Sequence, residues 1–253
     1  MYSARTMQVE YHKYHSPRLH QGFELKVYGH DGRPVVVFPS QDGRFFDFES
    51  WGMIEALSRH IGAGAIKVFA IDGRDWESWT DKHKHPHDRA KRADEYDAAI
   101  LHEAIPFVRQ HSRMRHPRDM IFTGCSMGAF HAMNFFLRHP GTADTVIALS
   151  GVYQLRTHLG DYMDDRVYFH SPLNYLASLS DHHLLELYRQ SRIVLCCGQG
   201  RWEEECLDDT RRLSALLAAK GVNHWLDEWG NDVDHDWPWW RKQLPYFLDK
   251  LGV

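Results

Sequence analysis

The chain has 253 residues, a length that suits a single large domain with its own buried core. Hydrophobic residues make up 43% of it and charged residues 25%, both ordinary for a soluble globular protein. The net charge of −4 comes without a basic block or an acidic tail, so we expect neither nucleic acid nor a membrane surface as a partner.

The four cysteines indicate the compartment. Cys125, Cys196, Cys197 and Cys206 lie in or beside apolar stretches without a Cys-x-x-Cys spacing, so we expect free thiols and no zinc site. Free thiols fit a reducing compartment. Residues 1–13 are polar and lack the apolar segment of a signal peptide, and the apolar runs are too short to span a membrane. A cytoplasmic location follows as the default expectation.

In chain order, short apolar runs typical of strands alternate with longer amphipathic stretches typical of helices. The predicted strands are 23–28, 34–38, 65–71, 119–123, 145–149, 192–197 and 224–229. The predicted helices are 48–60, 88–111, 127–138, 207–220 and 239–251. This alternation predicts an α/β protein of three layers, with a mostly parallel sheet covered by helices on both faces.

We find no linker or internal repeat, so we expect residues 1–253 to form one domain. Residues 151–191 are aromatic-rich and the least regular. They fall between two predicted buried strands, so we expect a small lid-like excursion over the carboxyl edge of the sheet.

The motif that carries most chemical information is Gly124-Cys125-Ser126-Met127-Gly128, between a predicted strand and a predicted helix. A serine at the apex of a strand–turn–helix sits in a tight turn that exposes its hydroxyl above the sheet edge. The two glycines leave room for the close approach of strand and helix. The alternative is a tight turn with an idle serine, but the context favours Ser126 as a nucleophile.

A general base is expected after the last strand, because the chain order in such folds is serine, acid, histidine. His235 is the only histidine in the loop 230–237 that follows the last predicted strand. Its imidazole can accept the proton of Ser126. The alternative is a solvated loop histidine, but its position favours the general base.

The acid is expected after the next-to-last strand, where three consecutive glutamates follow Gly198-Gln199-Gly200-Arg201-Trp202. Such a run is usually the solvated first turn of a helix. We favour Glu203, which is nearest the strand, and then Glu204, as the residue that orients His235. The weaker alternatives are Asp208 and Asp209, deeper in the helix, and Asp234 and Asp236, which flank the histidine.

Two backbone N–H groups are expected to hold the oxyanion of the reaction. Met127 begins the helix that follows the nucleophile, and the N–H groups of a helix N-terminus point at negative charge. The second donor normally comes from the loop after an earlier strand, and here we choose Gln41. The alternative is that Asp42-Gly43 in this loop only makes a turn.

Four segments together resemble a known family. They are the Gly-Cys-Ser-Met-Gly-Ala elbow, Pro-Ser-Gln-Asp-Gly-Arg at 39–44, Gly-Gln-Gly-Arg-Trp-Glu at 198–203 and Asp-His-Asp-Trp-Pro-Trp-Trp at 234–240. They are similar to the bacterial putative esterase family, which also includes S-formylglutathione hydrolases, feruloyl esterases and mycolyltransferases. The resemblance covers roughly residues 15–250 and implies an α/β-hydrolase fold with a minimal cap.

Carried over by position, the resemblance implies Ser126, Glu203 and His235 as catalytic residues, with the N–H groups of Gln41 and Met127 as the oxyanion hole. Many relatives have aspartate as the acid, so the register between Glu203 and Glu204 stays open by one residue.

The resulting hypothesis is a serine esterase that cleaves a small-molecule carboxylic ester through an acyl-enzyme. No phosphate-binding glycine-rich loop is present, so we expect no nucleotide cofactor. Aromatic residues of the predicted loops either line an acyl pocket or pack the loops down; they are Phe45, Phe46, Trp76, Trp79, Tyr153, Tyr162 and Tyr168. The Trp239–Trp240 pair fits either the core or the interface of a homo-oligomer.

Three other functions were weighed. One is an acyltransferase, which shares the acyl-enzyme and differs only in the acceptor. Another is a non-catalytic ligand- or partner-binding protein of the same fold. The third is a metal-binding protein, since His83, His85, His87 and Asp88 lie close together, although a polar loop is the favoured interpretation and we expect no metal.

Overall fold

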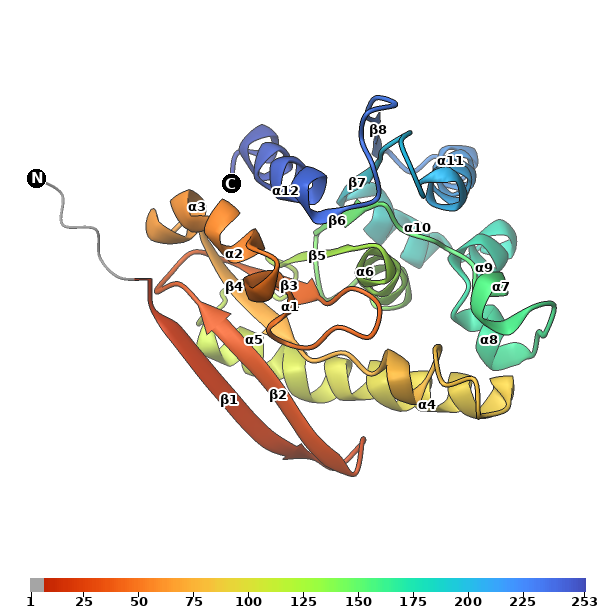
Figure 1. Cartoon of the computed structure of the whole chain (residues 1–253), viewed down its shortest axis with the longest axis horizontal. Helices are drawn as coiled ribbons and strands as arrows, with labels where there is room; N and C mark the ends of the chain where they lie inside the picture. Colours follow the sequence, from red (N-terminus) through yellow and green to blue (C-terminus); the bar gives the residue numbers. More distant parts are fainter. Residues whose placement is uncertain (1–6) are drawn as a thin grey trace, which may run out of the picture.

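The computed structural model describes residues 7–253, whose strands form one sheet (Figure 1). The strands are β1 Val9–Ser16, β2 Gln21–Tyr28, β3 Arg33–Phe38, β4 Ile66–Ile71, β5 Ile121–Cys125, β6 Thr145–Leu149, β7 Arg192–Cys197 and β8 Trp225–Glu228. Their spatial order is β1-β2-β4-β3-β5-β6-β7-β8. Strands β3 to β8 pair in parallel, and β1 and β2 add an antiparallel edge. The predicted mostly parallel sheet is confirmed.

Helices cover both faces of this sheet. The short ones are α1 Asp47–Ser50, α2 Met53–Ala56, α3 Ser58–Gly62, η1 Asp75–Glu77, η2 Ile100–Ala104, α7 Arg156–Leu159 and α8 Asp165–Phe169. The longer ones are α4 Pro86–Ala99, α5 Ile105–His111, α6 Met127–Arg138, α9 Pro172–Ser178, α10 His182–Arg189, α11 Glu204–Ala219 and α12 Trp237–Leu251. One core joins a sheet face to α4, α5, α6 and α9–α11, and the other joins the opposite face to α1–α3 and α12, so the three predicted layers are present.

The central strands lie between these two cores because their residues are apolar on both sides. Strand β4 is buried over its whole length, and so are β5 and β6. Near-continuous apolar runs are typical of parallel strands covered on both faces. Their carboxyl ends therefore meet at one edge of the sheet, where the loops that follow them converge.

The prediction of one continuous helix over residues 48–60 was wrong. The segment forms three short helices: Gly52, with a left-handed φ of +74°, separates α1 from α2, and Leu57, with φ −91° and ψ 0°, separates α2 from α3. The apolar residues at positions 51, 54 and 57 have the spacing of one buried helix face, and Ile54 and Leu57 are buried, but Trp51 is 52% exposed.

The predicted helix 88–111 is divided by the π-helical turn η2. Pro106 lacks a backbone N–H and cannot make the usual helical bond, which the wider turn accommodates. Residues 151–191 are more regular than expected, since they contain the helices α7 to α10. Strand β1 was missed, because an edge strand with partly exposed faces has no clear apolar alternation.

Within residues 7–253, no helix has the length and apolar character needed to cross a bilayer. All four cysteines are buried and unpaired, as expected from their apolar surroundings.

Candidate active site

Ser126 lies between the carboxyl end of β5 and the first residue of α6. Its backbone adopts φ +57° and ψ −123°, a conformation that L-residues rarely adopt. The N–H of Ser126 donates to the carbonyl of Leu149 at 2.9 Å, which ties the turn to the neighbouring strand β6. The strained turn holds the serine hydroxyl above the edge of the sheet, as the motif predicts.

The two glycines of the motif allow this turn to pack tightly. A Cβ atom on Gly124 would lie 2.3 Å from the carbonyl carbon of Gly128. A Cβ atom on Gly128 would lie 2.4 Å from the carbonyl oxygen of Phe38, at the end of β3. Both positions therefore require glycine.

The structure brings Ser126, His235 and Glu203 together in a continuous hydrogen-bonded chain. The Nε2 atom of His235 lies 2.8 Å from the Oγ of Ser126. On the other side of the ring, Nδ1 lies 3.0 Å from Oε2 of Glu203. One imidazole thus connects a partly exposed hydroxyl to a buried carboxylate.

The carboxylate of Glu203 is only 1% exposed, and protein donors surround it. Its Oε1 accepts the hydroxyl of Ser150 at 2.6 Å and the N–H of Gly198 at 3.3 Å. Its Oε2 accepts the thiol of Cys197 at 3.3 Å in addition to the imidazole of His235. These bonds replace the water that burial removes, so the acid is held in one orientation.

Two loops position the acid and the histidine relative to each other. The N–H of Gly200 donates to the carbonyl of Val233 at 2.9 Å. The N–H of His235 donates to the carbonyl of Arg201 at 3.0 Å. Asp234 in turn accepts the N–H of Arg201 at 2.8 Å. The loop after β7 and the loop after β8 therefore hold each other in register.

Each of the other candidate carboxylates has a different environment. Glu204 is exposed, Glu205 bonds the hydroxyl of Thr157, Asp208 pairs with Arg212, Asp209 accepts the N–H of Tyr153, Asp234 pairs with Arg201, and Asp236 caps the N-terminus of α12. Of the neighbouring glutamates, Glu203 is the one that lies against His235. The register follows from helix α11, which begins at Glu204, so that Glu203 still lies in the loop.

The two expected oxyanion donors lie at the same edge of the sheet. Met127 is the first residue of α6, where a helix leaves its N–H groups without intrahelical acceptors. Gln41 lies in an exposed turn after β3, closed by the N–H of Gly43 donating to the carbonyl of Ser40. Among residues 7–253, neither the N–H of Met127 nor that of Gln41 donates to another residue.

Three residues that contact Glu203 or His235 were missed by the sequence analysis. Ser150 has φ +53° and accepts the indole N–H of Trp240 at 3.0 Å while it donates to Glu203. The ring of Trp240 packs edge-on against His235, with the centroids 4.9 Å apart. The Sγ of Cys206 lies 3.7 Å from Nδ1 of His235, and burial raises the pKa of this thiol, so it remains protonated. Of the three, only Ser150 could have been found from the sequence, because Ser150-Gly151 directly follows the predicted strand 145–149.

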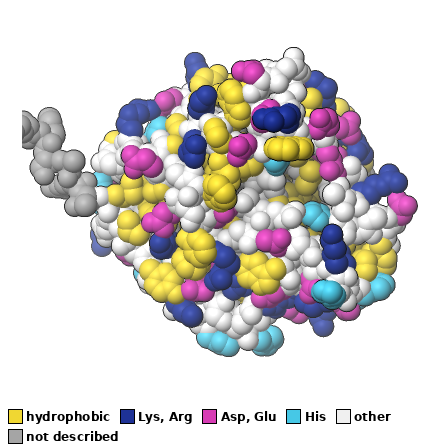
Figure 2. Space-filling view, in the orientation of Figure 1, with side chains coloured by type: hydrophobic (Ala, Val, Ile, Leu, Met, Phe, Trp, Pro, Cys, Tyr) yellow, Lys and Arg dark blue, Asp and Glu magenta, His cyan; other side chains and the backbone are white. Residues whose placement is uncertain are grey.

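The loop aromatic residues divide between core and surface. Trp79 and Tyr153 are buried, which makes them packing residues. Phe46, Trp51 and Trp202 are exposed by 42%, 52% and 71%. Figure 2 shows hydrophobic side chains grouped between charged ones on the face turned to the viewer.

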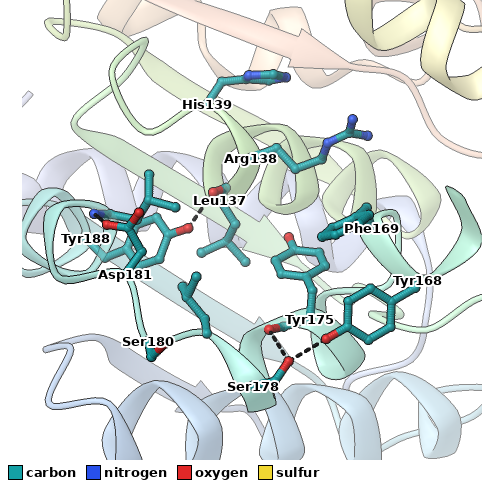
Figure 3. A pocket seen from close by; sticks show the side chains of 12 residues that line it. Leu137, Arg138, His139, Tyr168, Phe169, Tyr175, Ser178, Ser180, Asp181 and Tyr188 are labelled. Atoms are coloured by element: carbon teal, nitrogen blue, oxygen red, sulfur yellow. Dashed lines mark hydrogen bonds between the residues drawn. The ribbon is translucent and has the colours of Figure 1, made fainter. Parts of the chain in front are cut away.

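A cavity of about 620 Å³ opens at the opposite end of α6 from Ser126 (Figure 3). Tyr168, Tyr175 and Tyr188 line it together with the last residues of α6, Leu137 and Arg138. Helix α6 has 12 residues and is therefore about 18 Å long. This cavity is thus separate from the hydroxyl of Ser126.

The histidine-rich tract is used in local contacts. His85 caps the N-terminus of α4, and Nδ1 of His87 lies 2.8 Å from Asp164. Within residues 7–253, two groups of three side chains could share a metal ion: Glu10, His12 and His111, and Glu203, Cys206 and His235. Neither includes a residue of the tract.

Comparison with protein-family models matches residues 16–251 to the model described as putative esterase. The chain belongs to this family. Membership makes the protein an esterase. Among the curated proteins, direct sequence comparison finds no match.

Solved structures share the whole fold of this family member at low identity. A ferulic acid esterase has a TM-score of 0.75 and 17% identity, over 97% of both chains. An S-formylglutathione hydrolase from Staphylococcus aureus has a TM-score of 0.71 and 16% identity, over 98% of both. MPT51 from Mycobacterium tuberculosis has a TM-score of 0.69 and 14% identity, over 96% of this chain and 97% of its own. The α/β-hydrolase fold is therefore confirmed.

Proposed function

We propose that Ser126 is the nucleophile of this esterase, His235 its general base and Glu203 the acid that orients the histidine. The observation that carries the proposal is the unbroken chain from Ser126 Oγ through His235 to the buried carboxylate, at 2.8 and 3.0 Å. Both distances are within the range for hydrogen-bonded proton transfer. The same geometry of roles recurs in unrelated serine hydrolases.

In the acylation step, His235 Nε2 takes the proton of Ser126 as Oγ attacks the carbonyl carbon of the ester. The tetrahedral intermediate collapses, the bond to the alcohol oxygen breaks, and His235 returns the proton to the leaving alcohol. Water then attacks the acyl-enzyme by the same route and releases the acid and Ser126. Glu203 holds the imidazole with Nδ1–H toward the carboxylate and stabilises the imidazolium.

The N–H groups of Met127 and Gln41 are the donors we propose for the oxyanion. Met127 has a fixed position at the start of α6, where the helix dipole also favours negative charge. The loop of Gln41 is anchored because Asp47 accepts both the N–H and the hydroxyl of Ser40, at 2.9 and 2.7 Å. Preorganised donors of this kind stabilise the transition state without moving during the reaction.

We propose a small-molecule ester as the substrate, as the names of the ferulic acid esterase and S-formylglutathione hydrolase neighbours favour. The four unpaired thiols favour a reducing compartment such as the cytoplasm. The continuous sheet from β1 to β8 favours a single domain.

The test compares wild type, Ser126→Ala and Ser178→Ala on p-nitrophenyl esters of increasing acyl length. Ser178 lies in α9 near the distant cavity, so its variant is the matched serine control. We expect Ser126→Ala to lose turnover and labelling by a fluorophosphonate probe, with an unchanged thermal unfolding curve. Labelling or turnover that survives in Ser126→Ala would show that another residue is the nucleophile.

A further inference from the structure

A second cluster of chemically active side chains lies where strand β1 meets helix α5. Glu10 and His12 are two residues apart on β1, so they lie on the same face of the strand. His111 is the last residue of α5. Three potential metal ligands from two different elements therefore meet at one point, within 4.8 Å of one another.

One carboxylate oxygen stands at the centre of this cluster. Oε2 of Glu10 lies 3.0 Å from Nε2 of His12 and 2.9 Å from Nε2 of His111. Nitrogen and oxygen ligands about 2.0–2.2 Å from a tetrahedral zinc ion lie roughly 3.4 Å from each other. A lengthening of roughly 0.4 Å would therefore bring both contacts of the Glu10 carboxylate to the spacing of zinc ligands, and all three atoms already lie within 4.8 Å of one another.

Neighbouring groups already orient the carboxylate. Gln8 donates its side-chain N–H to Oε1 of Glu10 at 2.9 Å, which leaves Oε2 for the two imidazoles. Each oxygen of the Glu10 carboxylate therefore has its own side-chain partners, Gln8 for Oε1 and the two imidazoles for Oε2. Hydrogen-bonded carboxylates and imidazoles are typical of organised metal sites.

Aromatic rings hold the two imidazoles in place. His12 packs edge-on against Phe107, with centroids 4.9 Å apart, and His111 packs against Phe69 at 5.5 Å. The Nδ1 of His111 is buried without a hydrogen-bond partner among the described residues, so its ring makes its polar contact through Nε2. The two Nε2 atoms, of His12 and His111, therefore both face Oε2 of Glu10.

We propose that Glu10, His12 and His111 bind a divalent transition-metal ion, with zinc as the expected ion. Imidazole and carboxylate ligands suit zinc, and three protein ligands leave a fourth position for water. The ion ties β1 to α5. This matters because β1 is an edge strand of the sheet and, among residues 7–253, pairs with β2 alone.

The site is independent of ester hydrolysis. Four strand spacings separate β1 from β5, in the order β1-β2-β4-β3-β5, which is about 19 Å across the sheet. Zinc at this site therefore changes stability rather than turnover.

The first experiment titrates the metal-free full-length protein with Zn²⁺ and follows its thermal unfolding, then replaces Zn²⁺ with Co²⁺ and records the visible spectrum. We expect a rise in Tm of several degrees and the absorption bands of a cobalt ion with nitrogen and oxygen ligands. A sulfur-to-cobalt charge-transfer band would instead place the ion at Cys206, in the group with Glu203 and His235. Cys206→Ala removes that second group and should keep the Tm shift.

The second experiment uses His12→Gln and His111→Gln, with His15→Gln as the matched control. His15 is exposed on the opposite face of the same strand. We expect each ligand variant to weaken Zn²⁺ binding by at least about tenfold, whereas His15→Gln binds like wild type. A wild type without a zinc-dependent shift, or ligand variants that bind zinc as wild type does, would overturn the proposal.

Discussion

Glu203 shows how much of the proposed chemistry depends on one side chain. Four donors converge on its two oxygens, from His235, Ser150, Gly198 and Cys197. A carboxylate can accept all of them, because both of its oxygens are acceptors only. A carboxamide of the same shape must turn one N–H group toward a donor.

Glu203→Gln is therefore expected to lower kcat by about 10³–10⁴-fold, because the neutral amide neither fixes the tautomer of His235 nor stabilises its cation. Ester hydrolysis at substrate saturation measures the effect. Glu204→Gln is the matched control, since its side chain is the exposed neighbour in the sequence, and it should retain wild-type turnover. Equal losses in the two variants, or loss in Glu204→Gln alone, would contradict the assignment of the acid.

At the scale of elements, the site depends on the contact between α6 and the strands β3 and β5. The helix starts directly after Ser126 and runs close to the strand that precedes it. The glycines on either side of Ser126 are the places where backbone meets backbone. Backbone atoms cannot move aside as a flexible side chain can, so extra atoms there must distort the elbow.

Gly124→Ala and Gly128→Ala should each lower the free energy of unfolding by about 3 kcal/mol or more, since the added methyl group meets backbone atoms at 2.3 and 2.4 Å. Urea unfolding monitored by circular dichroism measures the loss. Gly62→Ala in α3 is the control, because its Cβ would meet no atom within 4 Å, and its stability should equal or exceed that of wild type. If Gly124→Ala unfolded at the same urea concentration as Gly62→Ala, the close packing of the elbow would be wrong.

At the scale of the whole molecule, one buried carboxyl group makes stability depend on pH. Burial raises the pKa of Asp209 to about 6, although the group accepts the N–H of Tyr153 at 2.7 Å. In the unfolded chain an aspartate titrates near pH 3.9. Between these values the folded state binds more protons than the unfolded state, so the free energy of unfolding falls as pH rises.

The contribution of Asp209 to stability is thus complete below about pH 4 and is lost as pH rises through about 6, by up to about 3 kcal/mol. Asp209→Asn cannot titrate, so the difference in unfolding free energy between wild type and variant should change across this window and stay constant above it. Denaturant unfolding at several pH values from 4 to 8 measures this difference. A constant difference over the whole range would show that Asp209 is ionised throughout.

The sequence by itself determined where seven of the eight strands lie along the chain, the elbow at Ser126 and the histidine that follows the last strand. These features are local: apolar runs mark buried strands, and glycines beside a serine mark a tight turn. The proposed zinc ligands and strand β1 have no such local pattern in the sequence. Their residues are polar or partly exposed, and His111 is about a hundred positions from Glu10 along the chain.

Only the tertiary structure decided which glutamate meets His235. The sequence favoured Glu203 over Glu204 but left the register open by one residue. The contact of Glu203 with His235 depends on helix α11 starting at Glu204 and on the backbone bonds between the loops after β7 and β8. Ser150 and Trp240 complete the surroundings of the acid from two further elements. Contacts between segments so distant in the chain arise from packing of the whole sheet, and no local pattern records them.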